Sequence, residues 1–189
     1  MQLGRMFLPN CIFSFFESEV SSLRKYLHAY IKFIDKTNYW IGRFVSILLI
    51  PMVGITVYEV FGRYVIARPT IWAWDLNIYL FAGVILLGGG YTFLEGGHIS
   101  VDVFSIHFSS RRKAIVDIIT SFFFFFGLAI IIWYGFDLAW ESWVRGETIP
   151  TRWAPPLWLH RVLIPIGAIL IMLQGIAKVI RDFFVLFDQ

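Results

Sequence analysis

The residues that could do chemistry in this sequence gather at the two ends of one apolar stretch. Its middle, residues 76–94, has no charged residue and is long enough to cross a bilayer core of about 30 Å. No charge lies inside the crossing, so the flanking groups are interpreted as structural or interface residues and not as a catalytic set. They are Glu59, Arg63, Arg68, Trp72, Asp75, Glu95, His98 and Asp102.

Two ion pairs are predicted among these groups. Glu59 and Arg63 are four residues apart, so on a helix they share a face and can pair. Asp75 falls in the first turns of the next helix, where the helix dipole favours a carboxylate. We also predict that it forms a buried or half-buried pair with Arg63 or Arg68. Thr70 is the expected N-cap of that helix.

A second set of charged candidates lies between residues 137 and 160, the longest connection between apolar stretches. Four tryptophans in this segment indicate a membrane interface, where Trp is enriched. The charged residues are expected to form an exposed crest above that belt. They are Glu141, Arg145, Glu147 and Arg152.

Composition and hydropathy predict the helices that hold these residues. The chain has 189 residues, 58% of them hydrophobic, and a mean hydropathy of +0.72. Soluble domains have about 45–50% apolar residues, so the sequence predicts an all-α membrane protein. We expect an N-terminal segment, residues 1–40, with an amphipathic interfacial helix, and a four-helix transmembrane domain, residues 41–182. The predicted spans are about 41–64, 72–94, 115–137 and 157–178.

The amphipathic helix is predicted from residue 18 to residue 39. Apolar residues recur there at helical spacing, and basic residues fill the other positions. This pattern favours the headgroup region of an anionic membrane surface; the alternative is packing on a partner protein. The apolar positions are Leu23, Leu27, Tyr30, Ile31 and Ile34, and the basic ones are Arg24, Lys25, His28, Lys32 and Lys36.

Two further patterns predict helix packing. Gly83, Gly88, Gly89 and Gly90 thin one side of the second span, which lets another helix approach closely. Five consecutive phenylalanines, residues 122–126, surround the third span, so that level is expected to be covered on all sides by lipid or protein.

Several classes of chemistry lack support in the sequence. The histidines do not pair across two spans, as a bis-His haem site needs. One cysteine excludes an intrachain disulfide and a Cys-based metal site, and a net charge of +3 gives no nucleic-acid footprint. No metalloprotease, phosphate-loop or nucleophile-elbow motif is present. An accessory membrane subunit, without enzymatic activity or cofactor, is therefore expected.

The orientation of the chain in the membrane is predicted from the distribution of its Lys and Arg residues. Of the 16 Lys and Arg residues, eleven fall in the N-terminal segment, the link between spans two and three, and the C-terminus, and five fall on the opposite side. The positive-inside rule predicts that both termini are cytoplasmic, which places Asp75 and the Trp-rich segment on the outer side.

The motifs around the apolar hairpin resemble a known family. EVFGRY at 59–64, RPTIWAWD at 68–75 and GGGYTFLEGGHISVD at 88–102 are similar to the small membrane subunit of tripartite ATP-independent periplasmic (TRAP) transporters, the DctQ-like family. The likeness extends over residues 35–184. Asp75 departs from the pattern, because Glu is usual there. SWVRGET at 142–148 and LQG at 173–175 look like the mannitol or chloroaromatic subgroup.

The resemblance implies a function. In that family a soluble periplasmic protein captures a small carboxylate-bearing solute, and a large membrane subunit moves it by a sodium-driven elevator motion. This chain would be the fixed scaffold in the bacterial inner membrane, in stable complex with the large subunit and transient contact with the solute-binding protein. The crest charges would help to dock that protein. The alternatives are a membrane anchor of a redox complex and an autonomous carrier or channel.

Overall fold

The computed structural model describes residues 8–96 and 110–187, so the candidates His98 and Asp102 lie outside the described residues. It contains the helices α1 (Leu8–Tyr64), α2 (Ala73–Leu94), α4 (Ser110–Arg145) and α5 (Leu157–Phe187). Within these described ranges, four helices are long and apolar enough to cross a membrane. The prediction of an all-α membrane protein with four spans is therefore confirmed.

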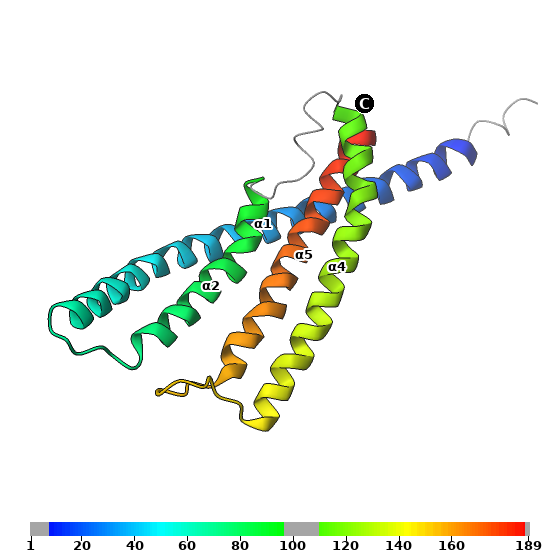
Figure 1. The fold of residues 1–189 in the computed structure, drawn as a ribbon. Helices are drawn as coiled ribbons and strands as arrows, with labels where there is room; N and C mark the ends of the chain where they lie inside the picture. Colours follow the sequence, from blue (N-terminus) through cyan, green and yellow to red (C-terminus); the bar gives the residue numbers. More distant parts are fainter. Residues whose placement is uncertain (1–7, 97–109, 188–189) are drawn as a thin grey trace, which may run out of the picture.

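The helices lie side by side in the order α1, α2, α5, α4 (Figure 1). α2 packs against α1 and α5, while α4 packs on α5 at the far edge. The links α1–α2 and α4–α5 lie at the same end, which we call the loop end (Figure 1). The opposite end, where α5 finishes, is called the tail end. Near the loop end the fold is thus a layer one helix deep with two broad faces. Toward the tail end α1 crosses α5 and packs on it, so the fold is two helices deep there (Figure 1).

α1 is one continuous helix of 57 residues, about 85 Å long. It continues through Pro51 and through residue 40, where the sequence suggested a boundary between an interfacial segment and the first span. Part of the predicted apolar stripe packs against other helices of the chain, because Ile31 and Ile34 are buried, with 7% and 5% exposure. Leu23 remains 61% exposed. The amphipathic segment is therefore an extension of the first span and is partly packed on the layer.

Glycines allow the inner helices to approach closely, as predicted for Gly89 and Gly90. A Cβ atom at Gly90 would collide with the Asn38 side chain of α1, and one at Gly89 would lie 2.8 Å from Ile171 of α5. Gly83 has no atom of this chain's described residues within 4 Å of a Cβ position, so it does not serve a close approach within the chain. Gly167 was missed, although a Cβ there would collide with the backbone of α2.

The phenylalanine run is covered by this chain on one side only. Phe124 stacks on Phe93 of α2 with ring centroids 5.4 Å apart. Phe122, Phe123 and Phe126 are 70%, 72% and 61% exposed, so α4 presents an apolar outer face at this level. Lipid or another protein must cover that face in a membrane.

Candidate functional site

The link between α1 and α2 is fastened by Glu59. Its Oε1 accepts a 2.7 Å hydrogen bond from Arg63, which confirms the pair predicted from their spacing. Its Oε2 accepts bonds from the backbone N–H of Thr70, at 3.1 Å, and from the Thr70 hydroxyl. The prediction that Thr70 caps α2 was wrong, because α2 has Trp72 as its N-cap residue without a side-chain cap bond. The Trp72 ring stacks on Tyr58, at 6.2 Å.

Asp75 is buried at the loop end, with 1% exposure. Its Oδ2 accepts a 2.6 Å hydrogen bond from the Thr151 hydroxyl, and its Oδ1 has no hydrogen-bond partner within the described ranges. The predicted pair with Arg63 or Arg68 is contradicted. The physical reason is that Asp75 faces the α4–α5 loop, whereas Arg63 is held on α1 by Glu59.

Arg161 organises the other side of that loop. Its Nη1 donates a 2.8 Å bond to Glu147 and a further bond to the hydroxyl of Ser142, which is fully buried. Ser142 in turn donates to Glu147, at 2.9 Å. We call Ser142, Glu147 and Arg161 the Arg161 cluster. Sequence reasoning missed it, since Arg161 entered only as one of the cations that set the orientation.

The loop between α4 and α5 is closed by backbone hydrogen bonds. The N–H of Ile149 donates to the carbonyl of Pro155, and the N–H of Leu157 donates to that of Glu147, both at 2.9 Å. The hydroxyl of Tyr79 on α2 donates to the carbonyl of Pro156, at 2.6 Å. Together with the Asp75–Thr151 bond, these contacts fix the loop to the layer.

The four crest candidates have different environments. Arg145 pairs with Glu141 at 2.5 Å and has a side chain that is 64% exposed. Glu147 lies 3.9 Å from Arg145 and 2.8 Å from Arg161. Arg152 is exposed at the tip of the loop beside Trp153, which is 43% exposed. Arg152 has no ion pair within the described part of the chain.

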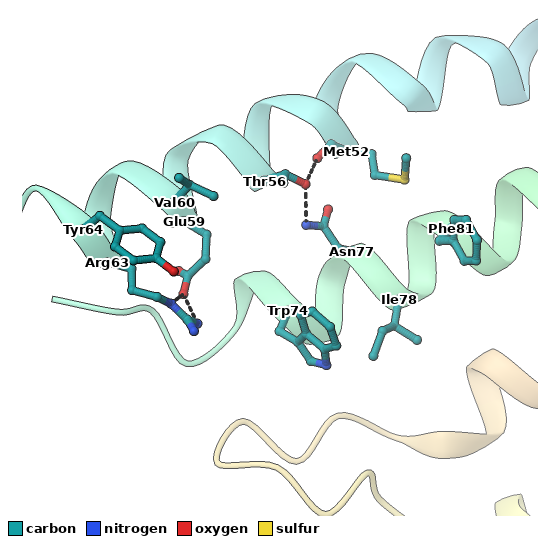
Figure 2. Close-up of a pocket in the computed structure, with 10 residues that line it drawn as sticks. All are labelled: Met52, Thr56, Glu59, Val60, Arg63, Tyr64, Trp74, Asn77, Ile78 and Phe81. Atoms are coloured by element: carbon teal, nitrogen blue, oxygen red, sulfur yellow. Dashed lines mark hydrogen bonds and ion pairs between the residues drawn. The ribbon is translucent and has the colours of Figure 1, made fainter. Parts of the chain in front are cut away.

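A groove of about 450 Å³ lies between α1 and α2 near the loop end (Figure 2). Its lining is mostly apolar, with the Glu59–Arg63 pair at one end. Inside it, Asn77 donates a 3.0 Å bond to Thr56 on α1 (Figure 2). Among the described residues no group of three His, Cys, Asp or Glu side chains could hold a metal ion. The groove has the chemistry of a packing or lipid surface.

The tail end holds a polar cluster that sequence reasoning missed. Asn38 of α1 donates a 2.6 Å bond to Gln174 of α5, and each is 1% exposed. Gln174 donates to Asp35 at 2.8 Å, and Arg181 donates to the same carboxylate oxygen at 2.5 Å. We call these four residues the Gln174 cluster. A single polar residue inside an apolar helix was the available signal.

The remaining candidate is Glu95. It forms the C-cap of α2, where its N–H donates to the carbonyl of Tyr91 at 3.0 Å, and its side chain is exposed. The structure therefore brings Glu59 together with Arg63, and Asp75 together with the outer loop, but it places Glu95 at the opposite end of α2.

Comparison with known proteins identifies the family. Residues 52–185 match the model of the DctQ component of tripartite ATP-independent periplasmic transporters. Comparison with curated proteins finds no match. The family match is to a transporter component, and it does not support the mannitol or chloroaromatic subgroup. Because the match spans more than half of the chain, including α2, α4 and most of α5, the protein belongs to the DctQ family of small TRAP transporter components.

Proposed function

We propose that this chain is the fixed small subunit of a sodium-driven TRAP importer of a small organic acid or related solute. The observation that carries the proposal is the position of the charges. Ionisable residues lie near the ends of the spans, and the middle of each span, such as 76–94 in α2 and 118–136 in α4, has none. Sites for substrate and Na⁺ would then belong to the large membrane subunit.

The layered architecture suits a scaffold. Near the loop end α2 and α5 lie between α1 and α4, toward the tail end α1 packs directly on α5, and polar contacts fasten both ends. Apolar side chains remain exposed on α1 and α4, for example Val57 and Phe123, at 61% and 72%. One broad face would pack against the large elevator-type subunit and the other would meet lipid. The mobile part of the partner would then move against a fixed surface.

The α4–α5 loop would help to dock the periplasmic solute-binding protein. Its tip presents Arg152 and Trp153, and Arg and Trp are enriched among the residues that dominate interface energetics. Glu141 and Arg145 lie beside it as a charged rim, which tunes encounter rate and salt dependence. Glu147 ties the loop to α5 through its ion pair with Arg161.

The expected membrane placement follows from the cation count. With ten of the 15 Lys and Arg residues of the described ranges on the tail-end side, the loop end faces the periplasm and both termini are cytoplasmic in the bacterial inner membrane. Residues 41–182 would form the membrane domain, and residues 1–40 a segment near the cytoplasmic surface. The motifs at 142–148 and 173–175 are the support for a place in the mannitol or chloroaromatic subgroup, and they do not name the solute.

A charge reversal at Arg152 tests this division of labour. The chain, its large subunit and the binding protein are reconstituted in proteoliposomes, and solute uptake is measured against binding-protein, salt and Na⁺ concentrations. Arg152→Glu should raise the binding-protein concentration for half-maximal uptake about threefold to tenfold at low salt, because the lost attraction is screened at high salt. The Na⁺ dependence should not change.

The matched control is Lys32→Glu, an equal reversal at an exposed residue of α1 on the tail-end side. It should leave the binding-protein dependence unchanged. A shifted Na⁺ dependence in Arg152→Glu, with normal docking, would assign part of the transport site to this chain and overturn the scaffold proposal. Full uptake by liposomes that lack the chain would do the same.

A further inference from the structure

A groove on the outer face of α4 contains an unpaired acid between two tryptophans. The groove has a volume of about 640 Å³, and Trp133, Phe136, Asp137 and Trp140 line it together with apolar residues. Trp133 and Trp140 are four and three residues from Asp137, so all three share one helix face. Their exposures of 76% and 69% show that no other part of the described chain covers the two rings.

No cationic side chain in the described part of the chain forms an ion pair with Asp137. It makes no hydrogen bond or ion pair there, and it is exposed. Arg161 reaches the carbonyl of the adjacent Leu138 at 3.4 Å, but its guanidinium is bound to Glu147. Arg145 is bound to Glu141. The groove therefore offers a negative charge that residues 8–96 and 110–187 do not neutralise.

The position of Asp137 matches the headgroup level of a bilayer. The charge-free run 118–136 before it is about 28 Å long, close to the thickness of the hydrocarbon core. The groove continues from Trp140 to Ala129 and Met172, which is about 16 Å along α4. That length is about half of the core, or one leaflet. One end of the groove is thus polar and aromatic, and the other is apolar at membrane depth.

We propose that this groove binds a phospholipid with a primary ammonium headgroup, with the ammonium at Asp137 and an acyl chain along Ala129, Ile132 and Met172. Trp rings attract cations, and a carboxylate adds charge and a hydrogen-bond acceptor. Because α4 is an edge helix packed on α5, its outer face is open to lipid. A lysine of a partner protein would satisfy the carboxylate but would not need an apolar groove one leaflet long. The site is independent of the transport function proposed above.

Native mass spectrometry of the full-length chain with equal amounts of phosphatidylethanolamine, phosphatidylcholine and phosphatidylglycerol tests the proposal. Wild type should retain phosphatidylethanolamine about fivefold more than phosphatidylglycerol, with phosphatidylcholine between them because its headgroup cannot donate a hydrogen bond. Asp137→Asn should reduce the preference to within about twofold, and Asp137→Glu should keep it. Trp133→Leu, a substitution at an exposed position, should lower ethanolamine-lipid retention without affecting the fold.

Glu95→Gln is the matched control, since it removes an exposed carboxylate at the other membrane end. It should leave the preference intact. Equal retention of the three lipids by wild type, or a preference that survives Asp137→Asn, would overturn the proposal. Loss of the wild-type preference in the complex with the large subunit would also overturn it, because a partner cation would then occupy the site.

Discussion

The two ends of the layer are held together by different kinds of polar contact. At the loop end the contacts are charged and partly exposed: the Arg161 and Glu147 side chains are 26% and 30% exposed. At the tail end the central pair is neutral and buried, because Asn38 and Gln174 are each 1% exposed. Charged groups remain where water can reach them, and amides take the positions that it cannot. This follows the greater cost of burying a charge than an amide.

The ends also differ in what they connect. The bonds of the Arg161 cluster join residues 5 to 19 positions apart, so the α4–α5 hairpin contains them. The bonds of the Gln174 cluster between α1 and α5 join residues 136 to 146 positions apart. The Arg161 cluster therefore stabilises one loop, whereas the Gln174 cluster holds α1 against α5. Asp75 is the exception at the loop end, as a buried carboxylate with one hydrogen-bond donor.

If the two ends differ in this way, the largest loss of stability should follow from a substitution at the tail end. Gln174→Leu removes two hydrogen bonds and leaves the buried Asn38 amide without its acceptor. We expect a loss of about 1–3 kcal/mol in the free energy of unfolding, measured by thermal or denaturant unfolding of the purified chain in detergent. Gln174→Glu retains an acceptor for Asn38 but buries a carboxylate beside Asp35, so it should lose at least as much. Equal stability of Gln174→Leu and wild type would remove the proposed difference between the ends.

A smaller and more local effect is expected at the loop end. Arg161→Gln removes the cation that binds Glu147 and Ser142, and partial exposure limits the loss to about 1–2 kcal/mol. Hydrogen exchange should increase for the amides of Ile149 and Leu157, which close the loop. Amides in the middle of α5 should keep their protection. Faster exchange throughout the layer would show that the Arg161 cluster is not a local support.

The smallest effect is expected at Asp75. Asp75→Asn keeps an oxygen that accepts the Thr151 hydrogen bond and removes a buried charge, so the free energy of unfolding should change by less than about 1 kcal/mol. Thr151→Val removes the donor and should destabilise the loop by about 1 kcal/mol. Unfolding measurements on both variants and on the double variant check this. A loss of several kcal/mol in Asp75→Asn alone would indicate an ion pair with a cation of another subunit.

Contacts between residues close in sequence were predictable, and contacts across the layer were not. The spacing of Glu59 and Arg63 was sufficient, because the helix itself sets their distance. Hydropathy was sufficient to predict the four spans, because each span is one continuous stretch of mostly apolar residues. Gly89 and Gly90 indicated close approach, but Gly83 did not follow the same rule, because composition alone does not show which side of a helix faces its neighbour.

The partner of Asp75 was mispredicted because the sequence does not show which neighbour the side of α2 that carries Asp75 faces. Arg63 and Arg68 are nearer in sequence, but Asp75 faces Thr151, 76 positions away. The Gln174 cluster was missed for the same reason, since nothing in a single sequence pairs Asn38 with a residue 136 positions away. The order of helices in the layer decides both contacts, and hydropathy contains no information on that order.

The length of α1 carries the start of the chain beyond its contacts with α5. These contacts extend from the Gln174 cluster to His28, whose ring stacks on Phe184 at 4.8 Å, and to Arg24, which lies 5.5 Å from the centre of the same ring. Leu8 lies about 24 Å farther along the helix than Arg24. The helix can therefore act as a lever whose pivot is the Arg24–Phe184 contact. A change of about 10° in its direction at this pivot would displace the N-terminal end by about 4 Å.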